Sequence, residues 1–201
     1  DEINWDNLPS KFVLKCNHAS GRNIICNNKK YLNIIKAKNE LNKWINQNFF
    51  WHGREWVYKN IKPRIVAEKL LGQNGEILLD YKFMCFNGEP KCMFVCSERY
   101  SDDGLKVDFY DMNWNHMPFE RQYKNSKNTL LKPKGFDKMV ELSRTLSNEI
   151  PFVRVDFYDI DGKIYFGELT FFPGNGMEEF TPKYYDELLG SWIELPHKLI
   201  L

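Results

Sequence analysis

The feature that most constrains this chain is a pair of strand-like segments joined at Asp161-Gly162, because both segments carry charged residues within apolar runs. The first, 152–158, reads FVRVDFY, and the second, 164–172, reads IYFGELTFF. Side chains alternate between the two faces of a strand. Alternation separates the apolar from the polar side chains of the first segment: Val153, Val155 and Phe157 against Arg154, Asp156 and Tyr158. The pattern predicts a sheet that projects a cation and a carboxylate from its polar face.

The face on which Glu168 lies depends on the length of the turn. A two-residue loop at Asp161-Gly162 puts Glu168 and Asp156 on opposite faces, whereas a three-residue loop puts both on the face of Arg154. Three-residue loops usually hold one residue in the left-handed region, which Gly162 adopts at little cost. The same-face register is therefore available to this sequence.

A shared cation is one explanation for this acidic pair. Two neighbouring carboxylates repel each other unless a cation lies between them, and Mg²⁺ takes such oxygen ligands together with phosphates. The alternative is that Arg154 and Asp156 form a surface ion pair while Glu168 is solvated. The strand pattern alone favours neither explanation over the other.

A second group of polar residues follows a short apolar strand at 11–15. Lys15 ends this strand, a polar loop runs from Asn17 to Asn23, and a second strand follows at 24–26. A lysine at this place can neutralise phosphate oxygens, and loop N–H groups can bond to them. An ordinary hairpin turn with a solvated Lys15 explains the Ser20-Gly21 pair better when the loop is taken in isolation.

Two more segments carry polar residues within strand patterns. Glu68 and Lys69 interrupt the strand expected at 64–70, and Lys82 alternates with apolar neighbours. A solvent-exposed strand edge explains them, and so does a nucleotide cleft in which the backbone near Lys69–Leu71 pairs with adenine. Of the histidines, only His18 lies in a candidate phosphate loop.

The remaining segments predict an α+β protein with two lobes, 1–71 and 72–201. Helices are expected at 31–48, 136–149 and 184–189, and Asn87-Gly88 between two apolar runs predicts a hairpin. Residues 100–134 are polar, aromatic and weakly periodic, which indicates a long excursion beside the substrate. Strands and helices that are segregated in this way are typical of α+β folds.

Composition excludes several classes of function. Lys and Arg number 28 against 27 Asp and Glu, so no net charge favours nucleic acid or anionic lipid. No segment approaches the roughly 20 apolar residues of a membrane span. The five cysteines form no CxxC pair, and three lie in strand-like runs, so we expect buried thiols and a cytoplasmic protein.

In order along the chain, these segments resemble the TupA-like ATP-grasp family, which is associated with bacterial surface polysaccharide. The matching stretches are LPSKFVLKCNHASGRNIIC, GREWVYKNIKPRIVAEKLL, DYKFMCFNGEPK, VRVDFYDIDGKIYFGELTFFPGNG and PKYYDELLG. The resemblance implies an ATP-grasp fold, in which two α+β lobes with antiparallel sheets hold the nucleotide between them.

The resemblance also implies roles for individual residues. Lys15 looks like the phosphate-binding lysine, and the loop with Asn17, His18, Ser20 and Gly21 like the flexible lid. The other implied residues contact adenine and ribose (Glu68, Lys69 and Leu71), the phosphates (Lys82), the acyl phosphate (Arg154) and Mg²⁺ (Asp156 and Glu168). The Pro173–Gly176 turn would present the N–H groups of Gly174 and Asn175 to an oxyanion.

Two departures from the pattern concern the metal site and the start of the chain. ATP-grasp ligases such as D-alanine–D-alanine ligase usually carry Asn two residues after the second acidic ligand, where this chain has Thr170. A Thr hydroxyl is a weaker metal ligand than an amide carbonyl. These enzymes also begin with a further α/β domain, which is absent ahead of the phosphate-binding hairpin, so a lost segment or a partner is expected to supply it.

The expected activity is that of an ATP- and Mg²⁺-dependent ligase that joins a small-molecule or saccharide carboxylate to an amine or a thiol through an acyl phosphate. Family context places the substrates in capsule or wall polymers. The alternatives are a protein associated with a glycosyltransferase of polysaccharide synthesis, and a catalytically inactive ATP-binding partner module. The partners expected beside ATP and the carboxylate substrate are a second copy of the chain or a glycosyltransferase.

Overall fold

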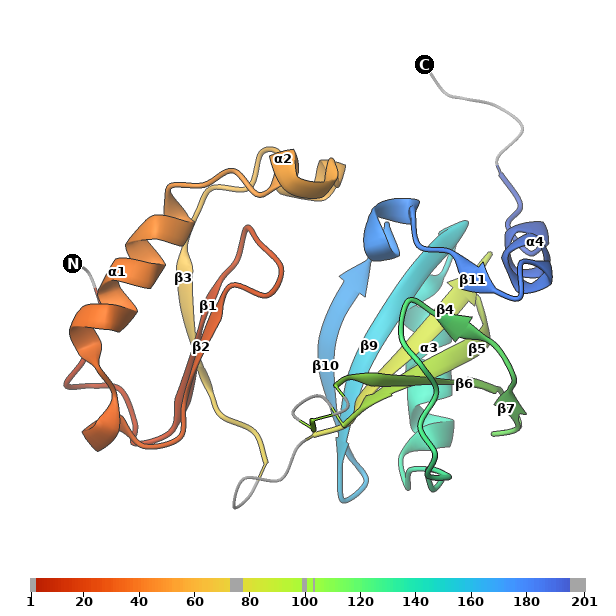
Figure 1. Cartoon of the computed structure of the whole chain (residues 1–201), viewed down its shortest axis with the longest axis horizontal. Coiled ribbons are helices and arrows are strands. Elements are labelled where there is room, and N and C mark those ends of the chain that lie inside the picture. The colour runs from red at the N-terminus through yellow and green to blue at the C-terminus, as the bar shows by residue number, and fades with distance from the viewer. Residues whose placement is uncertain (1–2, 73–77, 99–100, 103, 196–201) are drawn as a thin grey trace. The chain divides into compact units, whose positions relative to one another are not determined.

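The computed structural model describes residues 3–72, 78–98, 101–102 and 104–195. The chain divides into two compact units, Asp1–Glu76 and Ile77–Leu201, each with its own sheet and helices (Figure 1). The sequence suggests a boundary after residue 71, whereas the structure divides the chain after Glu76. Both units combine helices with antiparallel sheets, which is the α+β content expected from the sequence.

The first unit is a three-stranded sheet, in the order β2-β1-β3, with α1 against one face. Its elements are β1 (Phe12–Cys16), β2 (Asn23–Cys26), α1 (Ile34–Ile45), α2 (Phe50–Gly53) and β3 (Ile65–Lys69), with 3-10 turns at Lys29–Tyr31 and Trp56–Tyr58. The helix expected at 31–48 begins later because Asn33 caps it, accepting a hydrogen bond from the Lys36 N–H at 2.9 Å.

The two faces of this sheet differ in what covers them. Alternate residues of β1 (Phe12, Leu14 and Cys16) are buried in a cluster that includes Leu41 of α1. The opposite face carries Lys15 and stays partly exposed. Burial of one face therefore fixes the register of β1 and leaves Lys15 accessible.

The second unit is a six-stranded antiparallel sheet, in the order β10-β9-β4-β5-β6-β7. Its strands are β4 (Asp80–Phe86), β5 (Glu89–Ser97), β6 (Lys106–Asp111), β7 (His116–Met117), β9 (Phe152–Ile160) and β10 (Lys163–Thr170). A two-stranded ladder pairs β8 (Glu120–Arg121) with β11 (Phe180–Thr181), and the helices are α3 (Phe136–Ser147) and α4 (Tyr184–Ser191). As the sequence predicts, Asn87-Gly88 joins β4 to β5 as a two-residue turn.

Both faces of the large sheet are packed. On one face, α3 contacts β4, β5 and β9 and contributes Phe136 and Met139 to a cluster with Phe83, Val155 and Phe157. On the other face, a second cluster forms with α4 and with the segments around β8 and β11; its largest members are Phe86, Phe94, Phe109 and Phe119. The second face also carries Arg154 and Asp156, because they alternate with Val153 and Val155 along β9.

The expectation of a long excursion over residues 100–134 was wrong for β6, which is the fifth strand of the sheet. Four residues of β6 are buried because both faces of the strand are covered, so no alternation of apolar and polar residues marks it. Asp108 tolerates this burial because it accepts a hydrogen bond from the Ser126 N–H at 3.0 Å and lies 3.4 Å from His116 Nε2. Burial raises the pKa of Asp108, and these partners counteract the shift.

Among the described residues, no helix is both long enough and apolar enough to traverse a bilayer. The five cysteines are free and buried.

Gly135, which caps α3, offers a test of the packing between α3 and the β9–β10 hairpin. A Cβ at Gly135 would lie 2.2 Å from Ile164 Cδ1, whereas a Cβ at Gly190 in α4 would meet no atom within 4 Å. We expect Gly135→Ala to lower the free energy of unfolding by about 1–3 kcal/mol through overpacking. Gly190→Ala should leave it unchanged or raise it by about 0.5–1 kcal/mol, measured by urea denaturation. Equal effects of the two substitutions would contradict this packing.

Candidate active site

A β-bulge in the β9–β10 hairpin brings its acidic side chains to one face of the sheet. Near the turn, Phe166 pairs with Phe157, but further along Thr170 pairs with Arg154, a register shifted by one residue. A shift of one residue moves every following side chain to the other face. Glu168 therefore lies on the face that carries Arg154.

The turn itself is not the three-residue loop that would give this register directly. Asp161-Gly162 is a two-residue turn, since Ile160 pairs with Lys163. Asp161 and Gly162 have φ angles of 54° and 85°, as the twist of a two-residue hairpin requires. The bulge, which the sequence did not predict, supplies the extra residue in the strand instead of the turn.

Gly167 makes the bulge possible. A Cβ at this position would lie 3.1 Å from the carbonyl oxygen of Asp156 and 3.3 Å from its Cβ, both tighter than ordinary contacts. The two strands therefore approach each other more closely here than a larger residue would allow. This close approach places Glu168 beside Asp156.

Arg154 bridges the two carboxylates. Its Nε donates a hydrogen bond to Asp156 Oδ1 at 2.7 Å, and its Nη2 donates to Asp156 Oδ2 at 2.7 Å and to Glu168 Oε1 at 2.8 Å. Because one nitrogen lies within bonding distance of both groups, the two carboxylates converge on a single point of positive charge. The sequence left this arrangement open, and the structure shows it.

Burial differs sharply within this group. Asp156 is 3% exposed and Arg154 9%, whereas the side chain of Glu168 is 52% exposed. Burial disfavours the charge on Arg154, but its hydrogen bonds to Asp156 and the charges of Asp156 and Glu168 outweigh that cost, so the pKa of Arg154 is raised. Glu168 thus forms the solvent-accessible side of a buried ionic group.

Lys82 and Thr170 complete the polar cluster. The Lys82 Nζ donates to Asp156 Oδ2 and lies 3.9 Å from Asp80 Oδ2. Lys82 lies opposite Asp156 in the β4–β9 ladder, so neighbouring strands hold this contact in place. The Thr170 hydroxyl donates to Glu168 Oε1 at 3.1 Å, which fixes the outer carboxylate from a second side.

In the first unit, Lys15 and Glu68 form an ion pair on the open face of the sheet, with 2.5 Å between Nζ and Oε2. Both side chains are nearly half exposed. Lys69 lies opposite Phe12 and therefore on the α1 side, away from this pair. Leu71 follows β3 and is half buried.

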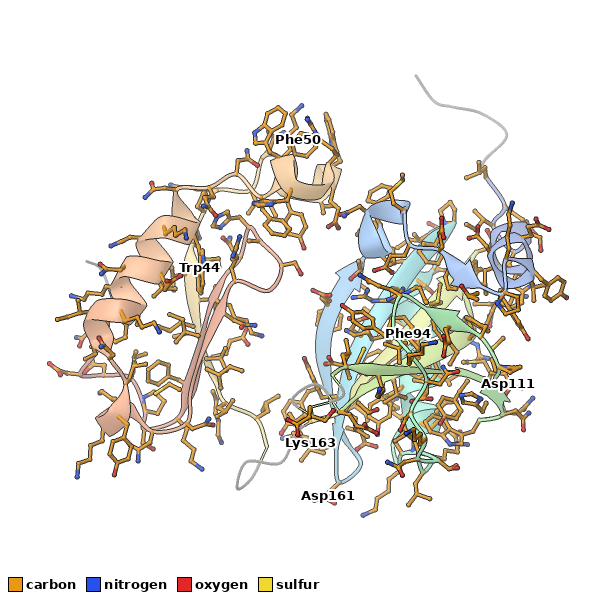
Figure 2. The ribbon with its side chains drawn as sticks, viewed as in Figure 1. Trp44, Phe50, Phe94, Asp111, Asp161 and Lys163 are labelled. Atoms are coloured by element: carbon orange, nitrogen blue, oxygen red, sulfur yellow. The ribbon has the colours of Figure 1, made fainter. Side chains whose placement is uncertain are left out.

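The loop after β1 is anchored at its start and exposed at its tip. The Asn17 side chain accepts a hydrogen bond from the Arg64 N–H at 2.7 Å and donates one to the Lys62 carbonyl at 3.3 Å. His18 is 2% exposed, and its Nε2 lies 3.2 Å from the carbonyl oxygen of Trp44, which Figure 2 labels in this unit.

The exposed tip carries Ser20 and Gly21, and Gly21 has a φ of 69° with open space where a Cβ would be. Asn17 and His18 thus hold the loop to the body of the unit, while Ser20 and Gly21 remain free of such contacts. The structure therefore separates the four loop residues into two anchors and an accessible tip.

The Pro173–Gly176 turn has two consecutive left-handed residues, with φ angles of 57° at Gly174 and 60° at Asn175. The Asn175 N–H already donates to the Phe172 carbonyl at 3.0 Å, so in this conformation it is not free for an oxyanion. The two positions are nevertheless close in sequence to Thr170 and follow shortly after β10, the strand that carries Glu168.

Sequence reasoning missed Arg121 and Glu178. Arg121 is 7% exposed in β8, and its Nε lies 2.7 Å from Glu178 Oε2. Its guanidinium lies over the ring of Phe94, as does that of Arg154, with Cζ-to-centroid distances of 4.5 Å and 5.9 Å. No periodicity around Arg121 signals this burial, because β8 is only two residues long.

The model of the TupA-like ATP-grasp family matches residues 1–194. The chain belongs to this family. Its two α+β units with antiparallel sheets are accordingly those of an ATP-grasp fold. The polar hairpin of β9 and β10 and the Lys15 strand both lie within the matched residues.

The similarity of this TupA-like chain to a solved structure is weaker. The crystal structure of D-alanine–D-alanine ligase from Bacillus anthracis, complexed with ATP, aligns with 16% identity and a TM-score of 0.44. The alignment covers 85% of this chain and 44% of that chain, so the TupA-like chain spans less than half of that ligase. No curated protein matches the sequence.

The bridging role of Arg154 is tested by its removal. We expect Arg154→Met to lower the free energy of unfolding by about 3 kcal/mol or more, because Asp156 stays buried with part of its pairing lost. Arg144→Met is the matched control; it removes an exposed pair with Glu89 at 2.8 Å and should cost about 1 kcal/mol or less. Adding Asp156→Asn to Arg154→Met should recover stability in urea titrations, and a purely additive double variant would contradict the bridge.

Proposed function

We propose that this TupA-like chain is the nucleotide-binding part of an ATP- and Mg²⁺-dependent ligase that activates a carboxylate as an acyl phosphate. The observation that carries the proposal is the convergence of Asp156 and Glu168 on one nitrogen of Arg154, beside Lys82. A buried acid and a half-exposed acid beside two cations are suited to phosphoryl transfer, which depends mostly on positioning and electrostatics.

The donor set fits Mg²⁺. Asp156 and Glu168 would hold the ion, with the Thr170 hydroxyl as a weaker third oxygen. No cluster of three or more acidic, His or Cys ligands occurs among the described residues, but Mg²⁺ is usually bound by one or two carboxylates and takes its other ligands from phosphates and water. When bound, the ion would offset negative charge on the phosphates of ATP.

The protein's own side chains would position the reactants. Lys15, the tip of its loop, and Lys82 would contact phosphates. Glu68 would bind ribose or the adenine amino group, and the backbone at Lys69–Leu71 the adenine edge. Arg154 would orient the transferred phosphoryl group through nitrogens that now bond to Asp156 and Glu168.

The reaction would proceed in two transfers. A carboxylate oxygen attacks the γ-phosphorus, the bond to the β,γ-bridging oxygen breaks, and ADP leaves. An amine, or a thiol in the alternative reaction, then attacks the acyl carbon, and inorganic phosphate leaves with the carbon–oxygen bond electrons. The Gly174 and Asn175 N–H groups would serve the oxyanion only if the Asn175 bond to Phe172 opens.

Family context suggests a saccharide or small-molecule carboxylate from bacterial surface polymers as the substrate and cytoplasm as the compartment. The second candidate is a catalytically inactive ATP-binding partner, such as a module associated with a glycosyltransferase. Thr170 favours it, because its hydroxyl bonds to Glu168 where the ligases carry an amide.

Glu168→Gln tests the metal assignment with little structural cost, because Glu168 is half exposed and Asp156 keeps its partners. We expect Mg²⁺-ATP to raise the melting temperature of the unaltered protein and to lose most of this effect in the variant. The melting temperature without ligand should change little. Glu141→Gln, an exposed acid on α3, is the control. Full protection of Glu168→Gln by Mg²⁺-ATP would remove the metal assignment.

Lys15→Ala tests the phosphate contact in the first unit. Loss of a charge-assisted contact should weaken ATP binding by roughly tenfold or more, measured by calorimetric titration with Mg²⁺ present. Lys43→Ala, at an exposed position of α1, should leave affinity unchanged. If the two variants bind ATP equally well, Lys15 has no role in nucleotide binding.

A further inference from the structure

Arg121 presents a second buried guanidinium next to the Arg154 cluster. Both guanidinium groups lie over the ring of Phe94, which is labelled in Figure 2 within the second unit. Phe94 lies opposite Lys82 in the β4–β5 ladder, and Lys82 contacts Asp156. Arg121 therefore shares an aromatic support with the residues proposed to bind phosphate.

The pairing of Arg121 is incomplete. Among the described residues, its one ionic partner is Glu178. Nε and Oε2 are 2.7 Å apart, yet neither atom has a hydrogen bond of acceptable geometry. Among the residues that the structure describes, none accepts a hydrogen bond from the terminal nitrogens Nη1 and Nη2, and neither nitrogen is a fully buried unpaired atom. With respect to the described residues, both nitrogens therefore remain available as donors.

Glu178 is itself held in place by the glycine turn. A Cβ at Gly174 would overlap the Glu178 side chain, at 2.1 Å from Cδ and 2.2 Å from Cγ. The carboxylate thus packs directly against the left-handed backbone at Gly174, where another side chain would displace it. Glu178 fixes one edge of the Arg121 guanidinium and leaves the opposite edge open.

The electrostatic environment favours a further anion at Arg121. Burial lowers the pKa of Arg121, Glu178 counteracts this effect, and the positive charge of Arg154 adds to the lowering. An ion pair that served stability alone would gain from closing its hydrogen bonds, since a buried charge with unmet donors is costly. An anion that bonded to the open nitrogens would satisfy those donors and offset the repulsion from Arg154.

We propose that Arg121 binds the carboxylate of the ligase substrate through its terminal nitrogens, a role that rests on the proposed function. Its planar fork matches a carboxylate in a bidentate geometry. The Phe94 ring supports the guanidinium, and Glu178 lies beside its Nε. The substrate is then a small anionic acid whose carboxylate docks beside Arg154, next to β8 and the glycine turn.

A binding experiment tests this subsite without turnover. The buried Nε–H of Arg121 gives a signal in nitrogen–proton correlation spectra of the full chain, assigned by its loss in Arg121→Lys. Malonate should shift this signal saturably at millimolar concentrations, and neutral malonamide should not. The exposed Arg144 serves as the internal control and should not shift. An Arg121 signal that malonate leaves unchanged would overturn the proposal.

Glu178→Gln provides an independent test, because this variant should bind malonate more tightly. Removing the competing negative charge should tighten malonate binding severalfold, provided that Arg121 remains in place. If the Arg121–Glu178 pair is purely structural, malonate should shift the Arg121 signal neither in the unaltered protein nor in Glu178→Gln. A malonate affinity that is the same in both proteins would also count against the subsite.

A kinetic arm separates this inference from the proposed function. Acyl phosphates are trapped by hydroxylamine from a panel of amino and sugar acids with Mg²⁺-ATP. Arg121→Lys should raise the KM for the carboxylate by roughly tenfold while the KM for ATP stays unchanged, and Arg144→Met should change neither. A shift of the Arg121 signal by malonate in a protein that does not bind ATP would contradict the ligase function alone. Turnover with an unchanged KM for the carboxylate in Arg121→Lys would contradict the subsite alone.

Discussion

The second unit is organised around the need to neutralise a carboxylate that its sheet buries. Asp156 lies on a packed face, where an unpaired negative charge would be costly. Arg154 comes from the same strand and Lys82 from the neighbouring one, so the ladder itself supplies both partners. Glu168 joins from the third strand and brings the formal charge of the four side chains to zero. The cluster is therefore stable without ligand, and its outer acid is the part that solvent reaches.

This arrangement depends on the apolar face beneath it. Val153, Val155 and Phe157 are buried against α3 and hold β9 in one register, so Arg154 and Asp156 must lie on the other face. The support is rigid because β9 pairs along its length with both β4 and β10. A site built on strands is positioned more accurately than one on loops, and this hairpin follows that principle.

Sequence patterns were informative where one face of an element is buried and the other is not. They predicted the alternation of β9, the Asn87-Gly88 turn, the helix α3 and the accessible position of Lys15. They failed where that contrast is missing: β6 is covered on both faces, and β8 is too short to show a period. The bulge was also beyond reach, because Gly167 alone does not distinguish a bulge from an ordinary strand glycine.

Long-range contacts were the other limit. Arg121 and Glu178 are far apart in sequence and meet only through the β8–β11 ladder and the fold of the glycine turn. The resemblance to a family identified the residues of the polar hairpin, because their order along the chain is distinctive. It carried no information about a pair that lies outside the matched motifs of the hairpin and the lysine strand.

The bulge has a consequence for how relatives of this chain should be aligned. What fixes the partnership of Asp156 and Glu168 is the parity of the chain length between them, and the location of the odd residue is immaterial. A relative with one more residue in the hairpin tip and one fewer at Gly167 would present the same chemistry. An insertion in the turn that is paired with a deletion in the strand looks disruptive in an alignment. It would nevertheless leave both carboxylates on the same face of the sheet.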